Sequence, residues 1–164
     1  MGQCNKAQEI YQVLFNQTTN ESDKASIYYQ LGCIKYNQGE YQEALSPHKK
    51  ALTIRQQLLP SNHPDSGSSY KNIGLGYKNM ADCHKALSNY KKALAIRQQS
   101  LPSNHPDLGT SYNNIGVVYT YMGNYSKAHS FYERAVQIGQ QSLPTNHPNL
   151  EMYRENLEGI KMKL

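Results

Sequence analysis

Apolar and small residues recur along the chain at the spacing of an α-helix. One segment carries them three, one and three residues apart, at Tyr70, Ile73, Gly74 and Tyr77. A second segment carries them at Ala86, Leu87, Tyr90, Ala93 and Leu94. Such spacings place side chains on one face of a helix. A short turn joins the segments, best seen at 122–124 in a later copy, so the pattern predicts antiparallel helix pairs.

The same segments return every 42 residues. The stretch 96–107 differs from 54–65 at one position and from 138–149 at three. Upstream, Tyr-Lys-Asn-Ile-Gly at 70–74 returns as Tyr-Asn-Asn-Ile-Gly at 112–116. A fixed period of this kind is typical of solenoids, in which each repeat buries its apolar face against its neighbours. The predicted fold class is therefore all-α, an α-solenoid of stacked antiparallel helix pairs.

The period divides the chain into three full repeats and two partial ones. Full repeats are expected over 23–62, 65–104 and 107–146. Residues 1–7 match 122–128 at four of seven positions, which predicts an unpaired second helix over 1–18. Residues 149–164 are expected to form an unpaired first helix. Because array ends normally carry polar caps, the two truncated ends are expected to be able to stack on a second copy.

The loops between repeats carry the motif Asn-His-Pro. Proline ends the second helix, and Asp65, Asp107 or Asn149 is expected to cap the next helix. His63, His105 and His147 precede the prolines. They lie on successive loops, one repeat apart, so they cannot converge on one zinc ion. Their expected role is loop packing, and no metal site is predicted.

Three glycines recur in register in the predicted first helices: Gly32, Gly74 and Gly116. Each costs about 1 kcal/mol relative to alanine in a helix. A repeated cost implies a repeated reason, and close approach of the paired helix is the simplest. The matching small residues on that helix are Ala44, Ala86 and Ala128. The first full repeat is the least regular, because Pro47 and His48 are expected to interrupt its second helix.

These positions resemble the tetratricopeptide repeat. The third full repeat carries the characteristic residues at Tyr112, Ile115, Gly116, Tyr119, Ala128, Tyr132 and Ala135. The 42-residue period and the Asn-His-Pro loop are similar to the kinesin light chain subfamily. In the first full repeat Lys35 departs from this pattern, because it replaces the helix tyrosine. The resemblance implies a right-handed superhelix whose first helices line a concave groove for another protein's extended or helical segment.

Carried onto this chain, the family's geometry places one amide per repeat on the concave surface, at Asn72, Asn114 and Asn156, with Gln30 in the first full repeat. An amide side chain both donates and accepts hydrogen bonds. The ladder is therefore predicted to hold the backbone of an extended peptide. The alternative is that these amides bond to neighbouring helices or loops.

Selectivity for the peptide's side chains is expected from further groove-facing residues. The polar ones are Lys71, Lys78, Asn113 and Tyr121, and the apolar ones are Leu75 and Val117. Two lysines favour an acidic ligand, and kinesin light chains are similar in binding acidic cargo peptides. The alternative is that both lysines are simply solvated.

Charge and composition narrow the function classes. The formal net charge is +5, but the basic residues are scattered, which favours a solvated surface over a nucleic-acid footprint. Cys4, Cys33 and Cys83 form no paired motif, which favours a reducing compartment and a cytoplasmic location. No apolar run approaches the roughly 18 residues needed to cross a membrane, so no membrane partner is expected.

No nucleophile motif and no glycine-rich phosphate loop occurs in the sequence. We therefore predict no catalytic residue, no cofactor and no enzymatic activity in this segment. Two alternatives to a peptide-binding scaffold remain. The array could be the regulatory arm of a larger multidomain enzyme such as a signalling ATPase or ADP-ribosyltransferase. RNA binding would instead require a continuous basic stripe on the inner helices, which Glu155 and the neutral positions disfavour.

Overall fold

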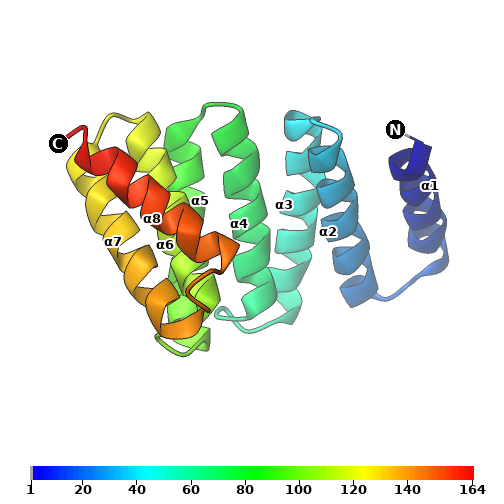
Figure 1. Ribbon diagram of the computed structural model, residues 1–164. Helices are drawn as coiled ribbons and strands as arrows, with labels where there is room; N and C mark the ends of the chain where they lie inside the picture. The colour runs from blue at the N-terminus through cyan, green and yellow to red at the C-terminus, as the bar shows by residue number, and fades with distance from the viewer. Residues whose placement is uncertain (1) are drawn as a thin grey trace.

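The computed structural model describes residues 2–164, with side chains described from Lys6 onward. Cys4 lies outside the described side chains. All regular secondary structure in this range is helical (Figure 1): α1 (Gly2–Gln17), α2 (Glu21–Asn37), α3 (Tyr41–Leu58), α4 (Pro64–Asn79), α5 (Cys83–Ser100), α6 (Pro106–Tyr121), α7 (Tyr125–Ser142) and α8 (Pro148–Lys161). The predicted all-α class is confirmed. No helix in the described range is both long and apolar enough to traverse a bilayer.

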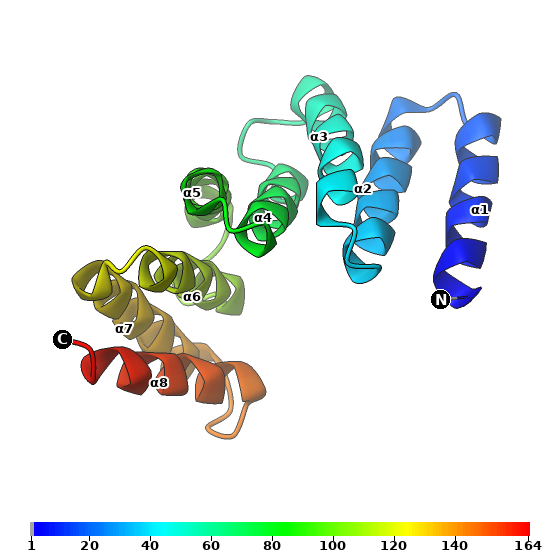
Figure 2. The same ribbon diagram turned by 90° about the horizontal axis from the view of Figure 1, so that it is seen from above.

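The helices stack in sequence order along one curved layer. The most extensive contacts join α2 to α3, α4 to α5 and α6 to α7. Figure 2 shows α2, α4, α6 and α8 on the inner side of an arc, with α3, α5 and α7 on its outer side. The first helix of each pair therefore lines the concave face. The division into repeats at 23–62, 65–104 and 107–146 stays a prediction.

The loop histidines, rather than the aspartates, cap the first helices. The Nδ1 atom of His63 accepts a hydrogen bond from the backbone N–H of Asp65 at 3.2 Å, and the geometry recurs at His105 and His147. The following proline has no N–H, so the first donor that needs a partner belongs to the residue after it. The histidine sits at the N-cap position with an extended backbone that points its ring toward this donor. The expectation that Asp65, Asp107 and Asn149 act as caps was wrong.

Pro47 does not interrupt its helix. α3 runs without a break from Tyr41 to Leu58 with Pro47 inside it. A proline removes the hydrogen bond to the carbonyl four residues earlier, here that of the exposed Glu43, which water can reach. Burial of Ala44, Leu45 and other residues of α3 stabilises the helix on both sides of the proline.

The in-register glycines lie beneath aromatic rings of the paired helix. A β-carbon added at Gly74 would stand 2.8 Å from Cδ1 of Tyr90, and one at Gly32 would stand 2.6 Å from the ring of His48. The expected close approach of the helices is present. Ala86, the small residue expected to face Gly74, contributes only its backbone to this contact. Its carbonyl oxygen lies 3.3 Å from the position of the added β-carbon. The ring, and not a small side chain, occupies the space that each glycine leaves.

Candidate functional site

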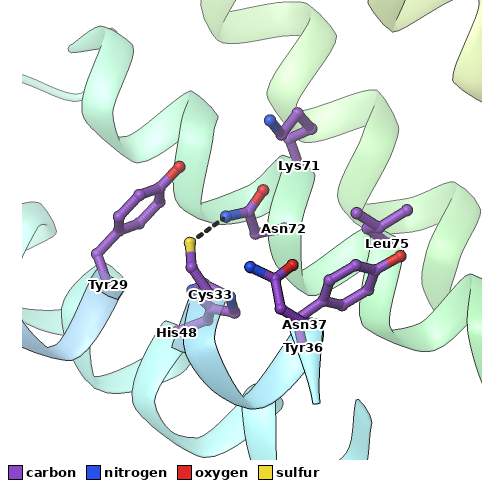
Figure 3. A pocket seen from close by; sticks show the side chains of 8 residues that line it. All are labelled: Tyr29, Cys33, Tyr36, Asn37, His48, Lys71, Asn72 and Leu75. Atoms are coloured by element: carbon purple, nitrogen blue, oxygen red, sulfur yellow. Dashed lines mark hydrogen bonds between the residues drawn. The ribbon is translucent and has the colours of Figure 1, made fainter. Parts of the chain in front are cut away.

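A cavity of about 310 Å³ lies between α2, α3 and α4 on the concave side (Figure 3). Its lining combines aromatic, apolar and polar side chains: Tyr29, Cys33, Tyr36, Asn37, His48, Lys71, Asn72 and Leu75. All of these residues except His48 belong to the first helices α2 and α4. The cavity therefore lies at the junction of two inner helices, where a ligand in the groove would contact both.

The cavity exists because two residues are smaller here than in the following repeats. Cys33 occupies the position that Leu75 and then Val117 take one and two periods later. His48 likewise stands where the larger Tyr90 and Tyr132 follow. Both His48 and Cys33 line the cavity. The first full repeat thus presents a hollow at a place where the later repeats carry bulkier side chains.

Two amide side chains tie α4 to the preceding first helix, α2. Asn72 Nδ2 donates to Cys33 Sγ at 3.6 Å across the cavity, as the dashed line in Figure 3 marks. Asn79 Nδ2 donates to the Tyr36 hydroxyl at 2.6 Å. These bonds connect α4 to α2, so they fix the inner wall of the array.

Burial keeps His48 neutral. Its side chain is 1% exposed, and its Nδ1 atom has no hydrogen-bond partner. Burial, together with the nearby charges of Arg55 and Lys71, lowers the pKa of His48 to about 4. At neutral pH the imidazole is therefore an uncharged ring that packs on Gly32.

The two other titratable groups of the wall respond to burial as well. Burial raises the pKa of the Cys33 thiol, so this thiol is protonated and a poor nucleophile at neutral pH. Burial, and then repulsion from Arg97, lowers the pKa of Lys71. The Lys71 amine makes no hydrogen bond and no ion pair within the described part of the chain. An anion placed beside it would relieve this unfavourable state.

The three asparagines of the expected ladder do not share one environment. Asn72 donates to Cys33, and Asn156 Nδ2 donates to Asn113 Oδ1 at 2.9 Å. These two amides therefore bond to a neighbouring helix, which is the alternative to holding a peptide backbone. Asn114 is half-buried and its amide makes no hydrogen bond to a described residue. Only this amide is free to meet a ligand without breaking an existing bond.

The remaining residues expected in the groove differ in exposure. Asn113 is 3% exposed and accepts from Asn156, so it supports the wall instead of facing a partner. Leu75 and Val117 are half-buried and pack on the core. Lys78 is half-buried, and Tyr121 is 67% exposed near the end of α6. The structure brings Lys71, Asn72 and Leu75 together at one cavity and leaves Tyr121 far along the chain from it.

Sequence reasoning missed the residues that α2 and α3 contribute to the cavity, above all Tyr29, Cys33 and His48. The signal was available in the comparison of repeat positions. At two positions where later repeats carry Leu, Val or Tyr, the first full repeat carries Cys and His. A loss of side-chain volume at one position in each helix of a pair predicts a hollow between them.

His63, His105 and His147 cap three separate helices. Among the residues that the structure describes, no three His, Cys, Asp or Glu side chains are grouped to hold a metal ion. Cys33 and Cys83 are both free thiols.

The family model of the tetratricopeptide repeat matches residues 23–99 and 65–141. No curated protein matches the chain significantly. Among solved structures, kinesin light chain TPR-like repeats from Podosopora anserina align with a TM-score of 0.81 at 21% identity, over 98% of this chain and 79% of that one. BtubC (BKLC) from P. vanneervenii aligns with a TM-score of 0.90 at 20% identity, over 98% and 66%.

A third structure, the first TPR of Spaghetti (RPAP3) bound to the HSP90 peptide SRMEEVD, aligns with a TM-score of 0.66 at 19% identity. It covers 87% of this chain and 94% of that one. At these identities the structural likeness concerns the fold, and the family model rests on the sequence itself. The chain belongs to the tetratricopeptide repeat family, and its fold is similar to that of kinesin light chain TPR-like repeats.

Proposed function

We propose that the concave face of α2, α4 and α6 holds an extended segment of a partner protein, with an acidic side chain of that segment beside Lys71. The unpaired, half-buried amine of Lys71 at the edge of the cavity carries this proposal. A carboxylate there would gain a charge-assisted hydrogen bond in a partly desolvated position, where such bonds are stronger than in water.

The cavity supplies the second contact. The rings of Tyr29 and Tyr36 and the side chain of Leu75 give it an apolar lining. An apolar side chain next to the acidic one would fill this space and displace water from it. The amide of Asn114, one repeat further along the inner face, is free to bond to the backbone of the same segment.

Tetratricopeptide arrays are typical scaffolds for protein interaction, and the RPAP3 array binds the acidic peptide SRMEEVD. By this likeness the chain acts by holding a partner protein and has no catalytic activity of its own. The unpaired cysteines favour the cytoplasm as the place where it does so. Stacking of its two ends on a second copy is a further expectation, which light scattering over a range of concentrations tests.

Titration of the fluorescein-labelled SRMEEVD peptide against Lys71→Ala tests the groove. We expect a loss of affinity of about three- to tenfold, the scale of a single ion pair. Lys127→Ala removes the same charge from the outer helix α7, outside the cavity, and is the matched control, which should bind as the unchanged protein does.

Asn114→Ala should weaken binding of both this peptide and a variant with glutamine in place of glutamate, because the amide contacts the backbone. Equal affinity for Lys71→Ala and the unchanged protein would remove the acidic contact from the proposal. Equal affinity for Asn114→Ala would remove the backbone contact.

A further inference from the structure

A second cavity, of about 480 Å³, lies on the outer side of the array. It is bordered by α3, α5 and the start of α4, and its lining residues are Gln56, Ser61, Ser66, Tyr70, Lys92, Ala95 and Ile96. α3 and α5 lie on the side opposite the concave face (Figure 2). No residue is shared with the inner cavity, so the two sites are separate.

This cavity is a place where the repeat pattern lacks a leucine. Ser66 occupies the position that Leu108 and Leu150 take in the next two repeats. Leu108 is 3% exposed and belongs to the same core cluster as Ile138, which corresponds by register to Ile96. In the later repeats a leucine of the chain itself thus fills the space between consecutive outer helices. At Ser66 the equivalent space is open.

Three polar groups that line this cavity have hydrogen-bond donors that no described residue accepts. Ser66 is 2% exposed, lines the cavity, and its hydroxyl makes no hydrogen bond to a described residue. The Tyr70 hydroxyl accepts from Gln56 Nε2 at 3.0 Å, which leaves its own proton unused. The Lys92 amine lies 5.4 Å from the centre of the Tyr70 ring and forms no ion pair in the described chain. The two hydroxyls and the amine suit a ligand that offers hydrogen-bond acceptors. Ala95 and Ile96 in the same cavity suit an aliphatic group on that ligand.

We propose that this outer cavity receives a leucine-like side chain of a partner protein, with a carboxylate next to it that pairs with Lys92. The aliphatic side chain would occupy the place that Leu108 fills one repeat later. The charge around the cavity favours an anion, because Lys91 and Lys92 of α5 form no ion pair in the described chain and α5 carries no acidic residue.

A basic outer face alone would equally attract a nucleic acid. The apolar wall and the missing leucine favour a protein, since a nucleotide offers no branched aliphatic group for a space of this shape. The array would then hold two partner segments, one on each face.

The probe is a seven-residue peptide with leucine at its centre and glutamate at all other positions, labelled with fluorescein. Filling the cavity by Ser66→Leu should lower its affinity about tenfold or more, because the peptide's leucine can no longer be buried. The natural leucines at 108 and 150 indicate that the fold accepts this change. The same peptide with a central alanine should lose a similar factor with the unchanged protein, a result that needs no protein variant.

The charge contact is tested by Lys92→Glu, which should weaken binding several-fold. Lys127→Glu is its matched control, because Lys127 also lies over a tyrosine, 5.6 Å from the ring of Tyr119, but outside the cavity. Ser66→Leu should lower the affinity by the same factor in a Lys71→Ala background, because the two cavities share no residue, and this separates failure here from failure of the inner site.

Undiminished binding by Ser66→Leu, or equal affinity for the leucine and alanine peptides, would overturn the proposal. So would the absence of binding to the unchanged protein at about 1 mM, the weakest affinity that one buried leucine and one ion pair should give. Tight binding of a single-stranded oligothymidylate that Ser66→Leu leaves intact and Lys92→Glu abolishes would show a general polyanion surface instead.

Discussion

The ring of Tyr132 lies directly over Gly116: a β-carbon on the glycine would stand 2.7 Å from Cδ1 of the ring. Tyr132 is 3% exposed and its hydroxyl lies 3.1 Å from Thr120 Oγ1, so the ring is fixed at both ends. The contact joins the two helices of the pair, α6 and α7. Glycine at this position lowers the intrinsic stability of α6, but only a residue without a side chain leaves room for the Tyr132 ring to be buried.

Gly116→Ala should destabilise the protein by about 1–3 kcal/mol, because the added methyl group overpacks a ring that cannot move freely. Gly159→Ala is the matched control: Gly159 lies in α8 and its added β-carbon would meet no atom within 4 Å. This change should stabilise by up to about 1 kcal/mol through helix propensity alone. Urea unfolding of both variants gives the two free energies, and the same sign for both would contradict the packing argument.

The histidine caps predict a specific pattern of substitution. His105→Ala leaves the backbone N–H of Asp107 without its acceptor and should lower the free energy of unfolding by about 1 kcal/mol. His105→Asn keeps an acceptor at the N-cap position and should retain most of the stability. Chemical denaturation of the two variants measures the difference. Equal loss in both would mean that the histidine matters for loop packing, the role expected from the sequence, and not for its acceptor.

The sequence alone was sufficient to predict the fold class, because a 42-residue period with helical spacing leaves few arrangements that bury every apolar face. It was not sufficient for the caps, since Asp65 and His63 both offer an acceptor near the start of α4. The choice depends on backbone direction: His63 has an extended backbone and Asp65 is already inside the helix. Side-chain type could not reveal this difference.

The binding residues were harder still to predict. Asn72 was predicted to face a ligand, but its amide bonds to Cys33, which lies 39 residues earlier. Register within one repeat cannot tell how far a side chain reaches toward the preceding repeat. The two cavities follow from positions where a small residue stands in a column of larger ones, Cys33 and Ser66. Such differences between repeats are readable from sequence once the helices have been aligned.

Arg97 and Ser111 illustrate how one junction between repeats has two solutions. Arg97 Nη1 donates to Ser111 Oγ at 2.7 Å, between α5 and α6. One period later the same positions carry Gly139 and Tyr153. There the tyrosine ring lies over the glycine, 3.3 Å from the site of an added β-carbon. The first junction pairs a long arginine with a small serine, and the second pairs a glycine with a large tyrosine ring.

Replacing Arg97 and Ser111 by the glycine and tyrosine of the later junction should show strong energetic coupling between the two substitutions. Arg97→Gly removes a buried side chain, and Ser111→Tyr crowds the arginine that remains, so each single change should destabilise by about 2 kcal/mol or more. In the double variant the ring fills the space that the arginine leaves. We expect a coupling free energy of at least about 1 kcal/mol in a double-mutant cycle measured by urea unfolding. Additive losses would mean that the two junctions are not interchangeable.

His48 should make the stability of the array depend on pH. Its pKa is about 4 in the folded protein, below the ordinary value of 6.5, so the unfolded chain takes up the proton first. The contribution of the neutral, buried ring is fully present above pH 6.5. It is lost as the pH falls toward 4, by about 1.4 kcal/mol per unit and about 3 kcal/mol in total. His48→Phe keeps a ring over Gly32 but cannot be protonated. The stability of this variant relative to the unchanged protein should therefore be constant above pH 6.5 and increase steadily from pH 6.5 to pH 4.5 in urea unfolding. A constant difference over that range would mean that burial does not hold His48 neutral.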